Sequence, residues 1–129
     1  MSSVLNYFEY EHFDSPDVQG SGQMMDLKII QMLDKARAIY GKPIYITSGY
    51  RTEAHNEKVG GVSGSSHLKG LAADVSDNAS GTKIDSRNRF LMLQALFAVG
   101  FDRIGVGNGF IHIDIDTSKK PDVIWTYGN

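Results

Sequence analysis

The chain has 129 residues, a net charge of -2 and no cysteine. A chain of this length fits one domain, and its slightly acidic balance lacks the positive field that attracts nucleic-acid phosphates. Without cysteine there are no disulfides, thiolate nucleophiles or Cys-type zinc sites, so any metal must be held by His and carboxylate ligands. We therefore expect a single domain over residues 1–129 that does not bind nucleic acid.

The N-terminal segment mixes aromatic residues with turn-forming residues. Residues 1–23 include Tyr7, Phe8, Tyr10, Phe13, Asp14, Pro16 and Gly20. Disordered segments carry fewer aromatic residues, so we expect an ordered arm packed on the domain. The segment has no basic start followed by an apolar stretch, and the chain has no run of about 18 apolar residues. We expect a protein made in the cytoplasm without a signal peptide and without a membrane span.

The first predicted helix and strand follow this arm. Apolar residues recur at three- and four-residue steps over 24–40, which predicts an amphipathic helix that ends before Gly41 and Pro43. The β-branched and aromatic residues at 44–48 predict a short strand. A brief helix is expected over 52–58.

A glycine- and serine-rich loop over 60–66 opens onto His67. The strand predicted at 72–76 places Asp74 among apolar neighbours, where a carboxylate is costly unless it is paired or bound to a metal. His67 and Asp74 are therefore the first candidate ligands.

The last third of the chain predicts a helix and a hairpin. Asp85 or Ser86 can cap a helix that ends at Gly100. We expect its buried face to carry Phe90, Leu93, Leu96 and Phe97. Residues 103–106 and 110–116 predict two antiparallel strands joined by a glycine-rich turn. Strands and helices without regular βαβ spacing favour an α+β fold.

The final predicted strand separates apolar from polar side chains. In 110–116 the isoleucines alternate with Phe110, His112, Asp114 and Asp116. The isoleucines then face the core, and the other face carries His112 and Asp114 about 6 to 7 Å apart. Together with His67 and Asp74, His112 can complete a tetrahedral zinc site with an open fourth position, as hydrolases use. The alternative is an ordinary polar strand face.

Four stretches of the chain resemble a known family. They are SGYRT at 48–52, HNEKVGGVSGSSHLKGLAADV at 55–75, GFDRIGVGNGFIHIDID at 100–116 and WTY at 125–127. They look like the zinc D-Ala-D-Ala carboxypeptidase and phage endolysin family, peptidase family M15, in its small single-domain branch. The resemblance implies a fold shared with the hedgehog signalling domain, with a small antiparallel sheet, helices packed on one face and a zinc groove on the other.

The same resemblance implies roles for individual residues. His67, Asp74 and His112 match the three zinc ligands, so the expected cofactor is Zn²⁺. Arg51 matches an arginine that such enzymes aim at the substrate's carboxylate or carbonyl, where its planar fork suits a carboxylate. We expect Ser66 to donate a hydrogen bond to the substrate.

Two further histidines and the single tryptophan lie outside this set. His12 and His55 lack a partner motif and are not expected to be ligands. Trp125 either lines the groove or closes the core.

The resemblance fails at one position that matters for catalysis. Many relatives carry the catalytic acid/base three residues before the last histidine ligand, and here that residue is Gly109. We expect Asp114 to be the general base because it shares a strand face with His112, with Asp116 and Asp102 as alternatives. The other role open to Asp114 is to hold a histidine ligand by its free ring nitrogen.

The expected activity is hydrolysis of peptide bonds in peptidoglycan stems by metal-activated water. Cleavage of a terminal D-Ala-D-Ala bond and endolysin-type endopeptidase activity both stay open. We expect a monomer that acts on peptidoglycan peptides of the cell wall as a phage or prophage protein, with a bacterial cytoplasmic dipeptidase as the alternative. A second hypothesis, kept open by Gly109, is a catalytically inactive, zinc-stabilised module that binds the cell wall or a protein.

Overall fold

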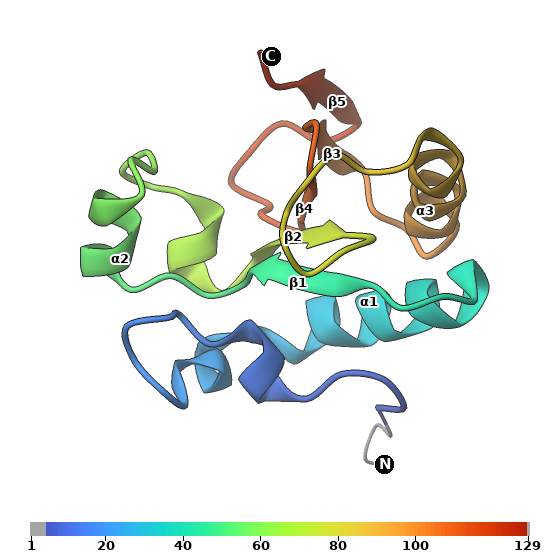
Figure 1. Ribbon diagram of the computed structural model, residues 1–129. Helices are drawn as coiled ribbons and strands as arrows, with labels where there is room; N and C mark the ends of the chain where they lie inside the picture. Colours follow the sequence, from blue (N-terminus) through green and yellow to red (C-terminus); the bar gives the residue numbers. More distant parts are fainter. Residues whose placement is uncertain (1–4, 129) are drawn as a thin grey trace.

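The computed structural model describes residues 5–128, so the first four residues of the predicted arm and the last residue of the chain lie outside the described residues. The helices, in chain order, are η1 (Tyr10–Phe13), η2 (Ser21–Met24), α1 (Leu27–Tyr40), α2 (Glu53–Lys58), η3 (Ser66–Lys69) and α3 (Ser86–Ala98). The strands are β1 (Tyr45–Ser48), β2 (Ala72–Ser76), β3 (Arg103–Val106), β4 (Ile111–Asp114) and β5 (Val123–Thr126). Figure 1 shows their arrangement.

The strands form one mixed sheet in the order β1-β2-β4-β3-β5. The α+β class and the antiparallel β3–β4 hairpin are confirmed. The resemblance implied an antiparallel sheet. The observed sheet is mixed, because β5 pairs in parallel with β3. The chain turns back after β4 but enters the sheet on the far side of β3, so β5 runs in the same direction as its new neighbour.

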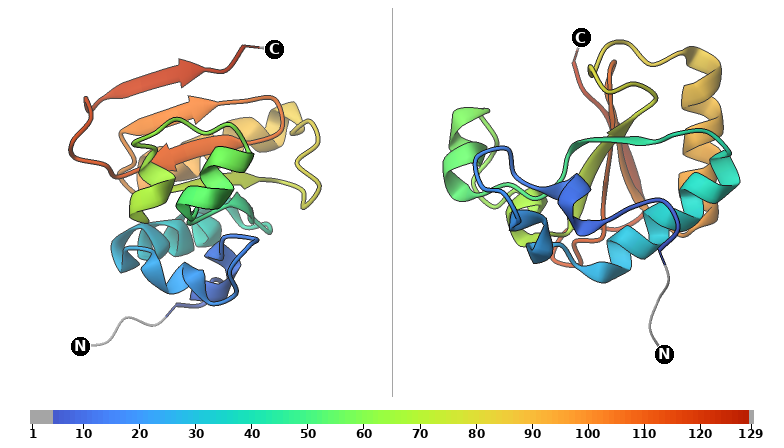
Figure 2. Two further views of the ribbon diagram at one scale, coloured as in Figure 1. Left: turned by 90° about the vertical axis from the view of Figure 1, so that its left-hand side faces the viewer. Right: turned by 60° about the horizontal axis from the view of Figure 1, so that its bottom comes forward.

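The two long helices lie on one side of the sheet and the short α2 lies on the other (Figure 2). Strand residues Val75, Ile104, Ile111 and Ile113 point into the core, where α1 contributes Ile29, Ile30 and Leu33. Each helix in the described part of the chain is too short or too polar to cross a membrane.

The face that α3 buries agrees only in part with the predicted one, because Leu96 is buried and Leu93 packs against the core as expected, whereas the two phenylalanines do not. Met92, Ala95 and Leu96 are buried, whereas Phe90 and Phe97 are 65% and 52% exposed. The helix is apolar on two sides, so the spacing of apolar residues alone could not determine which side packs against α1.

The N-terminal arm is held by a buried carboxylate as well as by apolar packing. Phe8 and Phe13 lie in the core. The Asp34 carboxylate on α1 accepts hydrogen bonds from the backbone amides of Asn6, Tyr7 and Phe8, at 3.0, 2.8 and 3.3 Å. These bonds satisfy amides that have no strand partner.

Replacing Asp34 with alanine is expected to lower the free energy of unfolding by about 2 kcal/mol, because several amide donors lose their acceptor. Urea unfolding measures this change, and hydrogen exchange should show faster exchange at residues 6–8. The exposed neighbour Lys35 provides the matched control, and Lys35→Ala should change neither quantity. Equal stability of the two variants would contradict the role of Asp34.

Candidate metal centre

Two candidate ligands lie side by side on the sheet face opposite the core. Asp74 on β2 is paired directly with His112 on β4. Alternation along each strand turns the neighbouring Ala73, Val75, Ile111 and Ile113 into the core. Gly105 on β3 and Trp125 on β5 continue the same row across the sheet.

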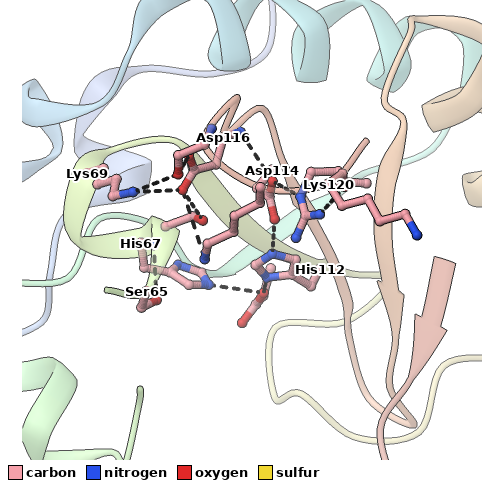
Figure 3. Close-up of polar contacts among 12 residues, drawn as sticks. Ser65, His67, Lys69, His112, Asp114, Asp116 and Lys120 are labelled. Atoms are coloured by element: carbon pink, nitrogen blue, oxygen red, sulfur yellow. Dashed lines mark hydrogen bonds and ion pairs between the residues drawn. The ribbon is translucent and has the colours of Figure 1, made fainter. Parts of the chain in front are cut away.

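The third candidate ligand, His67, comes from η3 and is 3% exposed. The Ser65 hydroxyl caps this short helix by accepting a hydrogen bond from the His67 amide. The His67 carbonyl accepts the amide of Arg51, which joins η3 to the turn after β1. Asp74 Oδ1 then lies 3.4 Å from His67 Nε2 and 3.0 Å from His112 Nδ1 (Figure 3).

In each imidazole, the nitrogen that faces away from Asp74, here called the outer nitrogen, has a hydrogen-bond acceptor as its partner. That partner determines which ring nitrogen carries the hydrogen. His67 Nδ1 lies 2.7 Å from the Gly49 carbonyl, which can only accept, so this nitrogen donates. His112 Nε2 lies 2.8 Å from Asp114 Oδ2 and donates to that carboxylate. In the neutral rings, His67 Nε2 and His112 Nδ1 therefore carry lone pairs that point toward Asp74.

The three inner atoms, His67 Nε2, Asp74 Oδ1 and His112 Nδ1, thus form a cluster of acceptors. Each of these residues offers one atom that can bind a metal, and these three atoms lie within 4.8 Å of one another. Donors about 2.1 Å from a tetrahedral zinc ion are about 3.4 Å apart, which agrees with the observed spacing. The residues present therefore fit a zinc ion.

The pKa shifts of Asp74 and His112 reflect the close approach of the carboxylate and the imidazoles. Burial acts to raise the pKa of Asp74, but the hydrogen bonds that the protonated rings of His112 and His67 donate outweigh burial and hold that pKa well below its usual range. Burial acts to lower the pKa of His112, whereas hydrogen bonds to the carboxylates of Asp114 and Asp74 raise it above its ordinary value. A metal ion or a proton between the three inner atoms is needed to satisfy their lone pairs.

Asp114 is 1% exposed, and both of its oxygens are engaged. Oδ2 accepts from His112 Nε2, and Oδ1 accepts from Arg103 Nε at 2.7 Å and from the Asp116 amide at 3.2 Å. Burial acts to raise the pKa of Asp114, but the hydrogen bonds from His112 and Arg103 lower it overall. Of the two roles that the sequence left open, these contacts favour orienting His112, and general-base catalysis by Asp114 stays a prediction.

The two alternative bases lie in other surroundings. Asp116 Oδ2 accepts from Ser66 Oγ at 2.7 Å and Lys69 Nζ at 3.1 Å, which ties η3 to the end of β4 (Figure 3). Asp102 lines a different cavity. Ser66 lines the candidate site but is 2% exposed, and its hydroxyl hydrogen is directed to Asp116. Substrate binding by Ser66 therefore stays a prediction.

Arg51 lies beside the three candidate ligands. Its Nη2 is 3.7 Å from Asp74 Oδ2, while Nε donates to Ser48 Oγ and Nη1 donates to Asn56 Oδ1. The sequence did not single out Asn56, which is buried on α2 and also donates to the carbonyl of Val62. An asparagine in a short helix gives no signal of such a role before the fold is known.

The candidate ligands open into a cavity of about 350 Å³. Its other lining residues include three aromatic residues and three basic residues, namely Phe110, Trp125, Tyr127, Arg51, Arg103 and Lys119. Trp125 therefore lines the groove, the first of its two predicted alternatives. Strand β5 was not predicted, although its residues VIWT carry the β-branched and aromatic signal of a strand.

Gly109 is the position at which the resemblance implied a catalytic acid/base, and the structure accounts for the glycine. A Cβ at Gly109 would lie 2.1 Å from the Gly81 carbonyl oxygen, so the residue is locked against the loop before α3. A carboxylate cannot be placed at this position without moving that loop.

Comparison with known families adds an independent finding. The sequence model described as Peptidase M15 matches residues 6–114, a range that contains the three candidate ligands and Arg51 but ends before β5. A search of curated proteins found no match.

We predict that His67→Ala, Asp74→Ala and His112→Ala each lower zinc affinity at least about a hundredfold, because each removes one ligand of a three-residue site. Titration calorimetry of metal-free protein should give one zinc ion per chain for the wild type. His55→Ala is the control, because His55 lies outside the cluster, and it should bind zinc like the wild type. Wild-type affinity in any of the three ligand variants would contradict the site.

Proposed function

This chain belongs to the peptidase family M15, and on that premise we propose that it is a zinc-dependent peptidase that hydrolyses peptide bonds in bacterial peptidoglycan stems. The convergence of His67 Nε2, Asp74 Oδ1 and His112 Nδ1 in the lining of one cavity carries the proposal. A zinc ion held there supplies a Lewis acid that activates water and polarises a carbonyl group.

Arg51 is proposed to bind the substrate next to these ligands. Its guanidinium is held by Ser48 and Asn56 and lines the cavity near Asp74. There it can donate to the oxygen of the cleaved carbonyl or to a terminal carboxylate, adding positive charge where negative charge develops. These alternatives correspond to endopeptidase and D-Ala-D-Ala carboxypeptidase activity, and Ser66 is proposed to add a hydrogen bond on the same side.

The second candidate function is a zinc-stabilised binding module without catalysis. It is supported by Gly109 and by the engagement of both carboxylates, Asp74 and Asp114, among the described residues that line the cavity. For either function we propose that the protein acts at the cell wall as a monomer and as a phage or prophage component.

The zinc-loaded protein is expected to release free amines from purified peptidoglycan and to lose this activity when a chelator removes the metal. Re-adding zinc should restore it. Arg51→Lys should lower kcat/KM about tenfold to a hundredfold, because a lysine cannot reproduce the fork that Ser48 and Asn56 hold. Arg87→Lys, an exposed change on α3, is the control. If zinc-loaded wild type cleaves none of several wall chemotypes, the binding module is the better account.

Asp114→Asn separates the two roles of Asp114. If Asp114 orients His112, zinc affinity should fall about tenfold to a hundredfold, while kcat at full zinc occupancy stays within about tenfold of wild type. If Asp114 is the general base, kcat should fall a hundredfold or more at the same occupancy. Metal analysis of each sample, run beside the kinetics, establishes the occupancy. We expect the first result because both oxygens of Asp114 are already engaged.

A further inference from the structure

Arg103 on β3 lines the same cavity as the candidate ligands and contacts three different groups there and at its edge. Its Nε donates to Asp114 Oδ1, its Nη1 donates to the Lys120 carbonyl, and its guanidinium lies over the Trp125 ring. We infer that Arg103 is a positioning residue that orients His112 through Asp114 and holds Trp125 as a wall of the cavity. This role rests on the proposed function, because His112 needs a fixed orientation only if it binds a metal.

The first connection runs from Arg103 to the metal-facing nitrogen of His112. The pairing of Gly105 with His112 and of Ile104 with Ile113 places Arg103 beside Asp114 in the same ladder. Arg103 Nε holds Asp114 Oδ1 at 2.7 Å, and Asp114 Oδ2 holds His112 Nε2 at 2.8 Å. The ring is thereby turned so that Nδ1 faces Asp74, and such outer partners commonly tune metal affinity.

The second connection runs from Arg103 to the cavity wall. The Arg103 guanidinium carbon lies 5.1 Å from the Trp125 ring centroid, within the range of a cation–π contact. The Trp125 ring lies 5.5 Å from that of His112 and is tilted by 48°. Gly105 between them makes this possible, because a Cβ there would lie 2.5 Å from Trp125 Nε1.

An arginine is needed because its donors point in different directions from one plane. The side chain of Arg103 is 12% exposed and that of Asp114 is 1% exposed, so the pair is largely withdrawn from water. Removing the arginine leaves a buried carboxylate with His112 and one amide as its remaining partners. A lysine could keep the charge near Asp114 but could not also hold the Lys120 carbonyl and cover the indole.

A double-mutant cycle on zinc affinity tests the first connection, using the full chain and a competing chelator. Arg103→Ala should weaken zinc binding about tenfold, and Arg103→Lys should recover part of the loss. In an Asp114→Asn background, Arg103→Ala should have little further effect, because its route to His112 is already cut. Arg87→Ala, on the exposed face of α3, should bind zinc like the wild type.

Trp125 itself reports the second connection, because it is the only tryptophan in the chain. Arg103→Ala should shift its fluorescence emission to longer wavelength and lower its anisotropy, since the indole loses its cover. Arg103→Lys keeps a cation and an aliphatic stem at the site, so it serves as the folded comparison if Arg103→Ala is too unstable to purify. Long-range ¹H–¹⁵N spectra of the zinc-loaded protein should show the proton of His112 on Nε2 in the wild type.

These measurements separate this inference from the proposed peptidase activity, because none of them uses a substrate. Additive effects of Arg103→Ala and Asp114→Asn on zinc affinity, or unchanged emission from Trp125 in both Arg103 variants, would overturn the positioning role. If the cycle is non-additive and the emission shifts, the role stands even if the wild type cleaves no peptidoglycan. If the wild type cleaves but both readouts are unaffected, the peptidase stands and Arg103 has no part in it.

Discussion

The candidate site depends on one carboxylate held between two imidazoles. Asp74 lies on a strand whose neighbouring side chains are buried in the core, so its charge cannot be satisfied by bulk water alone. The backbone carbonyl of Gly49 and the carboxylate of Asp114 hold the outer nitrogens of His67 and His112, which leaves only lone pairs facing Asp74. A cation is the simplest group that satisfies the lone pairs of all three inner atoms. To bind one cation, η3, β2 and β4 have to bring these atoms close together.

The rest of the fold keeps these three donors in place. The sheet pairs Asp74 with His112 directly, and core packing behind β2 and β4 prevents either strand from slipping, because a shift by one residue would turn isoleucines into the site. η3 lies outside the sheet and is held by hydrogen bonds. The His67 carbonyl accepts from the Arg51 amide, and the His67 ring donates to the Gly49 carbonyl. Ser66 and Lys69 both donate to the Asp116 carboxylate. The chemistry is thus placed by a rigid sheet on one side and by a pinned loop on the other.

Much of the fold could be predicted from periodicity and turn residues. The β2 boundaries, the β3 boundaries and the hairpin of β3 and β4 agree with prediction, although β4 (Ile111–Asp114) is shorter than the predicted 110–116. The exposure of Phe90 and Phe97 on α3 and the parallel position of β5 were not predicted, since both depend on which neighbour an element meets rather than on its own pattern. The three candidate ligands could be named from residue type and setting, whereas Asn56 and Arg103 act through partners that only the tertiary structure brings within reach.

Gly109 shows why the catalytic base is the hardest part of such a site to read from sequence. Motif spacing directs attention to position 109, but the Gly81 carbonyl fills the space that a side chain there would need. The nearest substitute by strand alternation, Asp114, is bound on one side by His112 and on the other by Arg103. A carboxylate with both oxygens engaged is suited to fixing a ligand's tautomer, whereas a base must release and regain protons at the cavity. The contacts of Asp114 therefore suit it to holding the His112 ring, and the glycine at position 109 leaves that ring as the group that this part of the sheet is built to fix.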